Sequence, residues 1–339
     1  MTLSIFIETC LAGKNLSVVE ASKALDVIMT GQASDVQIAA LLVALRAKGE
    51  TAEEIQGFAE TMREHSVKIT IDDKNAIDLC GTGGDGTGTF NISTTAAFIA
   101  AGAGVTVAKH GNRSVSSMSG SADVLRSLGV NIECSAMRTG ECLNSIGIGF
   151  LFAPLYHPAM KHAAKARSEL GTRSIFNILG PITNPARVKY QVVGAHDKIV
   201  AEKILLTLKN LGAERAVTLH AQDGADEVTL SGSTNLFEHS TGKGISSYEV
   251  SAHSFGLPPA PRGVLSGGTA SENAKILTSI LGGEHGPRRD AAVANAALGI
   301  YVAGKAATLI EARVRAEEAI DSSAAMKKLD QLREYTNRP

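Results

Sequence analysis

The fold is decided by the stretch Asp78-Leu-Cys-Gly-Thr-Gly-Gly-Asp-Gly-Thr-Gly-Thr-Phe-Asn-Ile-Ser-Thr-Thr95, in which a glycine-rich loop follows an apolar segment. We expect the apolar segment to form a strand and a helix to begin at about Asn91. Glycine and threonine leave many backbone amides unobstructed, and the N-terminus of a helix adds free amides and a dipole that favours an anion. The stretch therefore predicts a phosphate-binding loop, and Asp85 inside it favours a metal ion beside the phosphate.

Two familiar phosphate-binding motifs fit this loop poorly. Gly81, Gly83 and Gly86 match GxGxxG, but a dinucleotide-binding fold needs an acidic residue at the end of the next strand. That strand is expected to end in Ala108-Lys109-His110, which places a cation there. A Walker A loop would need Gly-Lys-Ser/Thr at the right spacing, and the sequence does not contain it. Both interpretations are disfavoured.

Outward from the loop, short apolar runs alternate with helical stretches. This alternation predicts an α/β fold with a mostly parallel central sheet. The runs that we expect to be strands are 76–80, 105–108, 129–132, 148–152, 191–195 and 216–220. Helices are expected over 157–168, 288–303 and 309–335.

The first 65 residues have the pattern of a small helical domain. Three capping boxes and three glycines at helix ends mark the boundaries of its helices. The boxes are Ser17/Glu20, Ser34/Gln37 and Thr51/Glu54, and the glycines are Gly13, Gly31 and Gly49. An apolar, proline-interrupted segment, 175–185, is expected to return to this domain. We therefore predict a small helical domain of residues 1–72 with about 165–190, and a large α/β domain of 73–164 and 191–339.

Composition and charge exclude several classes of protein. The 339 residues include 33 basic and 34 acidic side chains, a net charge of −1, which argues against nucleic acid or an anionic membrane as the main partner. The four cysteines lack metal-ligand spacing and are expected to be reduced. We expect neither a signal peptide nor a membrane-spanning segment, and therefore a cytoplasmic protein.

Two further segments add charged groups to the predicted site. Lys109-His-Gly-Asn-Arg-Ser-Val-Ser-Ser117 follows the second strand and provides two cations and three hydroxyls. The carboxyl ends of parallel strands lie at one edge of a sheet, so this loop should lie beside the first one. Adjacent carboxylates at Asp226 and Glu227 suit Mg²⁺, which is held by few carboxylates together with water and substrate oxygens.

Taken together, these motifs resemble those of the anthranilate phosphoribosyltransferases. The resemblance extends over essentially the whole chain and departs from the family pattern at no motif position. It rests on Cys-Gly-Thr-Gly-Gly-Asp, Phe-Asn-Ile-Ser-Thr, Lys-His-Gly-Asn-Arg-Ser-Val-Ser-Ser, Arg-Ser-Glu-Leu-Gly-Thr-Arg, Asn-Ile-Leu-Gly-Pro-Ile-Thr-Asn-Pro and the Asp226-Glu227 pair. The fold that it implies is that of the pyrimidine-nucleoside phosphorylases, with a homodimer formed through the helical domain.

The resemblance implies transfer of the 5-phosphoribosyl group of phosphoribosyl pyrophosphate (PRPP) to the amino group of anthranilate, in the second step of tryptophan synthesis from chorismate. It implies Mg²⁺, two ions per subunit, held by Ser93, Asp226 and Glu227. Anthranilate would contact Gly81, His110, Asn112 and Arg167. PRPP would contact Gly81, Gly84, Asp85, Thr89, Asn91, Ile92, Ser93, Thr94, Lys109, His110, Gly111, Asn112, Arg113, Ser114, Val115, Ser116, Ser117 and Ser121.

Two alternatives remain at this stage. A pyrimidine-nucleoside phosphorylase would share the fold but would need no such magnesium ligands, and a non-catalytic homologue could bind nucleic acid. No residue is assigned as a general base, because the aryl amine of anthranilate is already neutral at pH 7. Association with an anthranilate synthase subunit is left undefined by the sequence.

Overall fold

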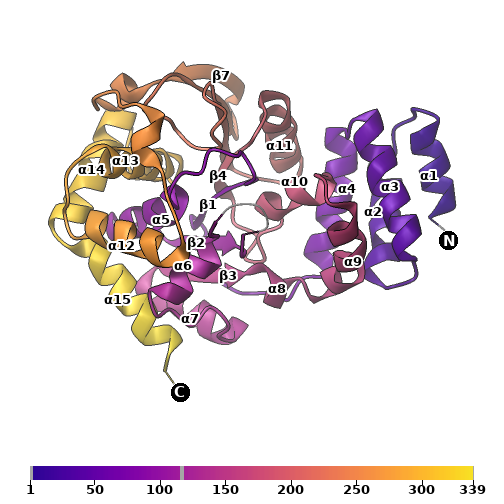
Figure 1. Cartoon of the computed structure of the whole chain (residues 1–339), viewed down its shortest axis with the longest axis horizontal. Helices are drawn as coiled ribbons and strands as arrows, with labels where there is room; N and C mark the ends of the chain where they lie inside the picture. Colours follow the sequence, from indigo (N-terminus) through magenta and orange to yellow (C-terminus); the bar gives the residue numbers. More distant parts are fainter. Residues whose placement is uncertain (1–2, 115–117, 339) are drawn as a thin grey trace.

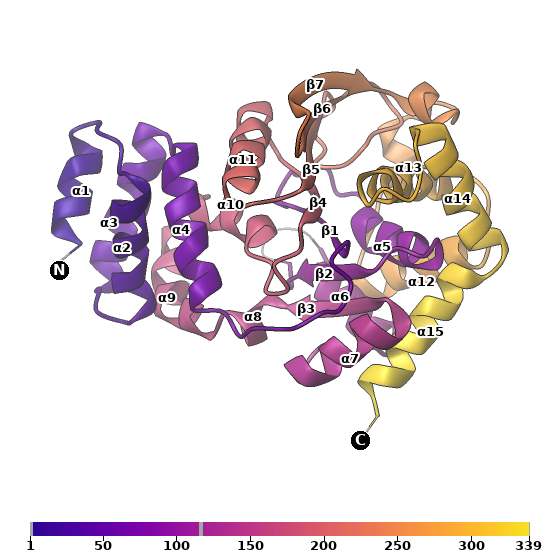
Figure 2. The ribbon, with the colours of Figure 1, turned by 180° about the vertical axis from the view of Figure 1, so that it is seen from behind.

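The computed structural model describes residues 3–114 and 118–338, and places a helical bundle beside a larger α/β unit (Figure 1). The bundle contains α1 (Ser4–Leu11), α2 (Val18–Met29), α3 (Asp35–Lys48), α4 (Ala52–Glu64) and α9 (Lys161–Leu170). After α4 the chain leaves the bundle along an extended connection and enters the sheet (Figure 2). None of the helices in the described ranges is long and apolar enough to cross a membrane.

The start and stop signals of the bundle are confirmed. Ser17, Ser34 and Thr51 each accept a hydrogen bond from the amide three residues later, and each receives the returning side-chain bond of a capping box. The three glycines at the helix ends have φ values of 71°, 72° and 86°, a region that favours glycine because it has no Cβ. Local capping chemistry therefore sets these helix boundaries.

Two later segments connect the bundle to the sheet. Helix α9 packs against α2 and α3, while α10 (Ile175–Ile182) contacts α4, α3, α11 (Lys198–Asn210) and strand β2 (Val107–Gly111). The apolar side chains of α10 belong to the same buried cluster as those of the bundle. Helix α10 therefore lies where the bundle meets the α/β unit (Figure 2).

The central sheet has seven strands in the order β3-β2-β1-β4-β5-β6-β7. The first five pair in parallel, and the last two are antiparallel additions at one edge. The strands are β1 (Ile77–Gly81), β2 (Val107–Gly111), β3 (Ile148–Phe152), β4 (Tyr190–Gly194), β5 (Arg215–Ala221), β6 (Thr234–Ser240) and β7 (Gly244–Val250). The mostly parallel sheet predicted from the sequence is confirmed.

Both faces of the sheet are covered by helices. On one face α5, α13 and their neighbours pack against Val192, and on the other α10, α11 and the bundle pack against Val193. Neighbouring residues of a strand point to opposite faces, so β4 contributes to both layers. The remaining helices are α5 (Ile92–Gly102), α6 (Ser121–Ser127), α7 (Ala136–Ile146), α8 (Ala153–Tyr156), α11 (Lys198–Asn210), α12 (Ala270–Leu281), α13 (Pro287–Val302), α14 (Leu309–Asp321) and α15 (Ala324–Thr336).

Some local expectations were wrong. The run 129–132 is no strand, because Gly129 turns the chain with φ 82° and Val130 and Ile132 are buried among helices. The segment expected as one helix over 309–335 is two, α14 and α15, and Ser323 between them has φ 61°. The antiparallel strands β6 and β7 were not predicted, since β7 is mostly exposed and lacks an apolar run.

Candidate active site

The glycine-rich loop leaves the carboxyl end of β1, at the point where the order of strands reverses. From β1 the chain proceeds to β2 and β3 on one side, and later returns to β4 on the other side. Crevices at such a reversal are the usual ligand-binding positions of open α/β sheets. Gly81 pairs with Gly194, and a Cβ at either position would collide with Asp226. The glycines thus allow the acidic loop after β5 to approach the end of β1.

The two carboxylates of that acidic loop are held by backbone amides of the glycine-rich segment. The amide of Gly83 donates to Asp226 Oδ2 at 2.8 Å, and the amide of Ser93 donates to Glu227 Oε1 at 2.9 Å. Burial, reinforced by the charge of Asp85, raises the pKa of Asp226 to about 6. Burial and the neighbouring Asp226 raise the pKa of Glu227 well above its ordinary value. A positive charge bound here would relieve the repulsion between the carboxylates of Asp85, Asp226 and Glu227.

The chemistry of this group fits magnesium. Glu227 Oε2 is buried and has no hydrogen-bond partner, and a cavity of about 20 Å³ is lined by Ser93, Asp226 and Glu227 among others. Within residues 3–114 and 118–338 there is no cluster of three or more His, Cys, Asp or Glu side chains suited to a metal. Mg²⁺ needs fewer carboxylates, because water and substrate oxygens complete its octahedron.

Lys109 is a buried cation beneath the loop. Its Nζ donates to the carbonyl of Leu79 at 2.6 Å and to Ser93 Oγ at 3.4 Å. Burial lowers the pKa of Lys109, although nearby Asp78 acts in the opposite direction. The β2 strand therefore delivers positive charge to the N-terminus of α5, where free amides also favour an anion.

Asp78 organises the floor of the site, a role that motif reading did not assign. It accepts hydrogen bonds from the amide of His110 at 3.1 Å and from Asn184 Nδ2 at 2.8 Å. Asn184 also donates to the carbonyl of Ala108 at 2.8 Å. Burial raises the pKa of Asp78 to about 6. Asn184 lies in the quoted segment Asn-Ile-Leu-Gly-Pro-Ile-Thr-Asn-Pro, which was the available signal for it.

The end of the glycine-rich loop is fastened by a residue far away in the sequence. Asn273 on α12 donates to Asn91 Oδ1 and to Ser119 Oγ, both at 2.8 Å. Thr94 Oγ1, on the first turn of α5, is buried without a hydrogen-bond partner and is free to bind a ligand oxygen. No local pattern marks Asn273, because its importance depends only on tertiary packing.

The second predicted loop is folded around Asp123, whose Oδ2 accepts from the amides of Ser114 and Gly120. Ser121 Oγ donates to the carbonyl of Asn112 at 3.3 Å. Arg113 instead contacts Glu133 at 3.2 Å, in an exposed ion pair. Three residues expected to bind PRPP, Val115, Ser116 and Ser117, lie outside the described residues.

Of the residues expected at anthranilate, His110 lies on the side of the site next to α10. His110 Nδ1 lies 2.9 Å from the carbonyl of Gly180 on α10, and its ring lies 5.2 Å from that of His157. Burial, with His157 adding to the effect, lowers the pKa of His110 to about 3. A carbonyl only accepts, so Nδ1 carries the proton and the buried, unpartnered Nε2 is an acceptor. Motif reading did not single out His157.

Arg167 is on α9, with its guanidinium 4.9 Å above the ring of Phe176. Burial lowers its pKa, so it is more than an exposed helix cation. The neighbouring Arg173 links the bundle side to the loop, because its Nη2 donates to the carbonyl of Gly84 and its own carbonyl accepts from Arg46. Within the described residues, no hydrogen bond or ion pair joins Arg167 to the glycine-rich loop.

The other expected PRPP residues line the same region. Asp85 lies in the loop, and its Oδ1 accepts a hydrogen bond from the amide of Thr87 at 3.2 Å. Thr89 pairs with Ser266 in a single antiparallel β-bridge. Ile92 is buried as the first residue of α5, and Gly111 ends β2. The parallel pairing of β1 and β2, which α5 connects, thus brings these residues to one edge of the sheet. The acidic pair lies beside them.

Comparison with known proteins first defines the class. Residues 73–326 match the model of the glycosyl transferase family, a/b domain, and residues 4–66 match the glycosyl transferase family, helical bundle domain. Both parts of the structure are therefore those of this family, and the two matches together cover most of the chain.

Individual relatives define a narrower family within the glycosyl transferases. Anthranilate phosphoribosyltransferase from Salinibacter ruber is 51% identical over 97% of both chains, and that from Acetivibrio thermocellus is 52% identical over 96% of this chain and 94% of its own. The crystal structure of the Thermus thermophilus anthranilate phosphoribosyltransferase superposes with a TM-score of 0.93 at 40% identity, covering 98% of this chain and 99% of that one. The chain belongs to the anthranilate phosphoribosyltransferase family.

A more distant relative has been solved with ligands. Anthranilate phosphoribosyltransferase from Saccharomyces cerevisiae, in complex with PRPP and Mg, has a TM-score of 0.90 at 26% identity, covering 98% of this chain and 97% of that chain. The small helical part, the mostly parallel sheet and the family predicted from the sequence are thus confirmed.

Proposed function

We propose that this protein transfers the 5-phosphoribosyl group of PRPP to the amino group of anthranilate, giving N-(5-phosphoribosyl)anthranilate and diphosphate. The observation that carries the proposal is the meeting of the glycine-rich loop, buried Lys109 and the Asp226-Glu227 pair at one sheet edge. The relatives named above support it. Dinucleotide binding is not favoured, because the last residues of β2 before Gly111 are a buried lysine and histidine and not an acid.

PRPP would bind with its diphosphate over the loop and the start of α5. Breaking the bond to ribose C1 develops negative charge on the leaving diphosphate, and Lys109 would stabilise that charge as it grows. Bound Mg²⁺, held by Ser93, Asp226 and Glu227, would neutralise the same charge. The raised pKa values of the two carboxyls are the expected state of a cation site before its cation binds.

Anthranilate would enter from the bundle side. A guanidinium matches a carboxylate with two parallel hydrogen bonds, and Arg167 is already oriented by Phe176. His110 Nε2 is an acceptor for the aryl amine, although its low pKa makes it a weak base. The residues would therefore act by orientation rather than by strong proton abstraction. Closure of the bundle against the sheet would exclude water, which competes for the ribosyl cation.

The direct test is an assay that follows the loss of anthranilate fluorescence with PRPP and Mg²⁺. Loss that requires both reagents supports the proposal. Magnesium-independent phosphorolysis of thymidine would favour a nucleoside phosphorylase instead. A salt-dependent gel shift with DNA or RNA, without turnover, would favour a nucleic-acid-binding homologue.

The metal assignment makes a separate prediction. The double substitution Asp226→Ala/Glu227→Ala should reduce kcat by at least about 100-fold, because each charge-stabilising group of this kind contributes several kcal/mol. The circular dichroism spectrum should be unchanged. Near-normal turnover of the double variant at limiting Mg²⁺ would exclude these residues as ligands. A titration of activity against Mg²⁺ would also show whether one ion or two are needed.

The domain division and the dimer belong to the same proposal. We assign residues 1–72 and about 165–190 to the helical domain, supported by the packing of α9 and α10. Exposed apolar side chains on α1 and α3, including Ile5 (63% exposed) and Val36 (79% exposed), support a second copy of this chain as the partner there. A cytoplasmic location is supported by four free cysteines.

A further inference from the structure

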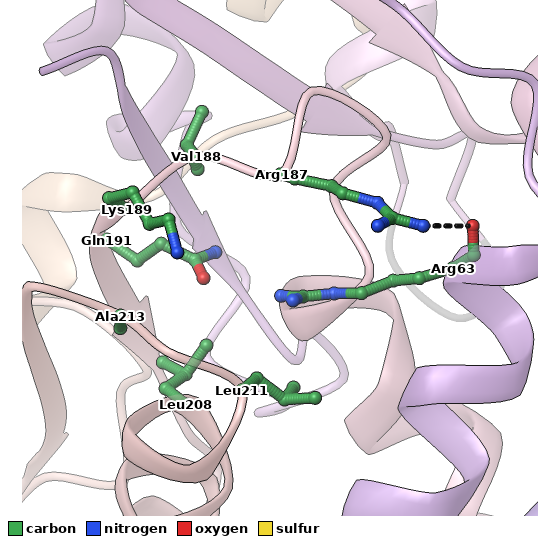
Figure 3. Close-up of a pocket in the computed structure, with 8 residues that line it drawn as sticks. All are labelled: Arg63, Arg187, Val188, Lys189, Gln191, Leu208, Leu211 and Ala213. Carbon is green, nitrogen blue, oxygen red and sulfur yellow. Dashed lines mark hydrogen bonds between the residues drawn. The ribbon is translucent and has the colours of Figure 1, made fainter. Parts of the chain in front are cut away.

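A second, basic cavity lies away from the glycine-rich loop, at the amino ends of β4 and β5. It has a volume of about 200 Å³, and its wall is formed by α4, the connection from α10 to β4, and the end of α11. In Figure 3 the side chains of Arg63, Lys189 and Gln191 extend toward a common space, while Leu208 and Leu211 lie across from them. The glycine-rich loop leaves the carboxyl end of β1, at the opposite edge of the sheet, so the cavity is separate from the proposed active site.

The cations of this cavity have backbone partners but no carboxylate. Arg63 Nε and Nη2 donate to the carbonyl of Ile182 at 3.0 and 2.7 Å, and Arg187 Nη2 donates to the carbonyl of Arg63 at 3.3 Å. Lys189 Nζ donates to the carbonyl of Gly212 at 2.9 Å. Across residues 3–114 and 118–338, no ion pair is recorded for any of these three cations.

The positive charge is therefore held together without an ion pair in the described structure, although the charge of Glu60 acts on Arg63 from a greater distance. Burial, followed by repulsion from Arg187, lowers the pKa of Arg63 to about 10. Arg187 is also one of two non-glycine residues with positive φ in the described structure, at 50°, a conformation that tertiary packing has to maintain. Arg63 lines the cavity, and its Nη1 donates no hydrogen bond within the described residues, so this group remains available to a ligand.

We propose that this cavity binds a small organic carboxylate. Its charged end would lie between Arg63 and Lys189, and its apolar body against Leu208, Leu211 and Ala213. The guanidinium provides a fork that suits a carboxylate, and an apolar cavity of about 150 Å³ is known to be large enough for a benzene ring. Because Arg63 belongs to the bundle and the other residues to the α/β unit, the ligand bridges the two.

The location is tested by soaking crystals with 4-bromophenylacetate and mapping the bromine by anomalous diffraction. A bromine peak between Lys189 and Leu211 is expected. Absence of bromine from this cavity at saturating probe overturns the proposal. The readout is a position and not turnover, so it is independent of whether the protein transfers phosphoribosyl groups.

Affinity in solution is tested by ¹⁹F NMR with 4-fluorophenylacetate, in an Arg167→Ala background that removes the proposed anthranilate contact. Lys189→Glu should weaken binding at least tenfold, since it places a like charge against the carboxylate. Lys243→Glu, an equal change in an exposed turn between β6 and β7, should leave the affinity unchanged. Arg63→Gln is a second variant that retains a donor but loses the charge, and it should also weaken binding.

Two results would contradict the assignment. If Lys189→Glu and Lys243→Glu bind the probe equally, the carboxylate does not bind at this cavity. If inorganic phosphate binds as tightly as 4-fluorophenylacetate in the same background, the apolar wall contributes nothing and the ligand class is wrong.

Discussion

Arg167 shows how tertiary structure changes the interpretation of a single residue. By sequence it is one of several cations on a helix that also carries Lys161 and Lys165. In the structure its guanidinium lies over Phe176 and burial lowers its pKa, whereas the side chain of Lys165 is 69% exposed beside Asp35. The two cations therefore occupy different environments although they are only two positions apart on one helix.

Replacement of Arg167 should affect one substrate selectively. Arg167→Ala should raise the anthranilate KM about 10–100-fold, the loss expected for a charge-assisted hydrogen bond of about 1.5–3 kcal/mol, and leave the PRPP KM nearly unchanged. Arg167→Lys should restore only part of the affinity, since an ammonium cannot pair bidentately. Lys165→Ala is the matched control on the same helix and should change neither constant. A rise in the PRPP KM alone would instead identify Arg167 as a phosphate ligand.

The buried pair His110 and His157 should make stability depend on pH. Burial lowers the pKa of His110 to about 3 and that of His157 to about 4, both below the ordinary 6.5. Between about pH 6.5 and 4 the unfolded chain binds protons that the folded chain does not. The contribution of these two histidines to stability is therefore complete above pH 6.5 and falls as the pH is lowered through this window, while Asp78 and Asp226, whose pKa values are raised to about 6, act in the opposite direction.

His157→Asn should make that fall less steep, by about 1 kcal/mol per pH unit, because one of the two buried imidazoles no longer titrates in the unfolded chain. Urea unfolding at several pH values between 4.5 and 7 measures the slope. The exposed His253 provides the control substitution His253→Asn, which should retain the parent slope. An unchanged slope in His157→Asn would show that this histidine does not contribute.

At the scale of elements, the helix ends of the bundle follow local chemistry closely. The Ser34 hydroxyl accepts from the amide of Gln37 at 3.3 Å, and Gln37 returns a bond to the amide of Ser34 at 3.1 Å. Gly49 closes the same helix with φ 86°. Each contact involves residues only a few positions apart, so neither depends on the rest of the fold.

Loss of one capping box should have a modest and measurable effect. Ser34→Ala should reduce the free energy of unfolding by about 1 kcal/mol, while Ser34→Gly should cost only a few tenths, because glycine at this position allows water to solvate the free amides. Urea denaturation at neutral pH distinguishes the two. Equal losses in both variants would show that the hydroxyl contact does not determine the stability of this helix end.

At the scale of the whole molecule, α1 and α3 are packed side by side in the bundle and carry apolar side chains on their exposed surface. The bundle lies at one end of the molecule, with α1 outermost and α4 nearest the sheet (Figure 1). A face of this kind suits an interface between two copies related by a twofold axis.

Val36→Glu should therefore convert a dimer to monomers, since the carboxylate would be buried without a partner. Size-exclusion chromatography with light scattering measures the mass directly. Ile310→Glu is the matched control, because Ile310 is 53% exposed on α14, in the α/β unit. If Val36→Glu retains the mass of the parent and Ile310→Glu does not, the contact lies on the α/β unit instead.

The sequence by itself determined the features that depend on neighbouring residues. It predicted the capped helices of the bundle, all five parallel strands and the loop between β1 and α5, because periodicity, caps and glycines act over a few positions. The family motifs also indicated which loops meet at the site. The segment 309–335 was predicted as one helix and is two, since Ser323 adopts positive φ at a position where the sequence has no glycine.

Tertiary structure decided the contacts between residues far apart in the chain. The hydrogen bonds from Asn273 to Asn91, from Asn184 to Asp78 and from Ser93 to Glu227 span 182, 106 and 134 positions. None of these pairings could be read from neighbouring residues, because each is selected by burial of polar groups that must find partners once water is excluded. The same is true of the basic cavity, whose cations come from α4 and from the connection before β4 and meet only when the bundle packs on the sheet.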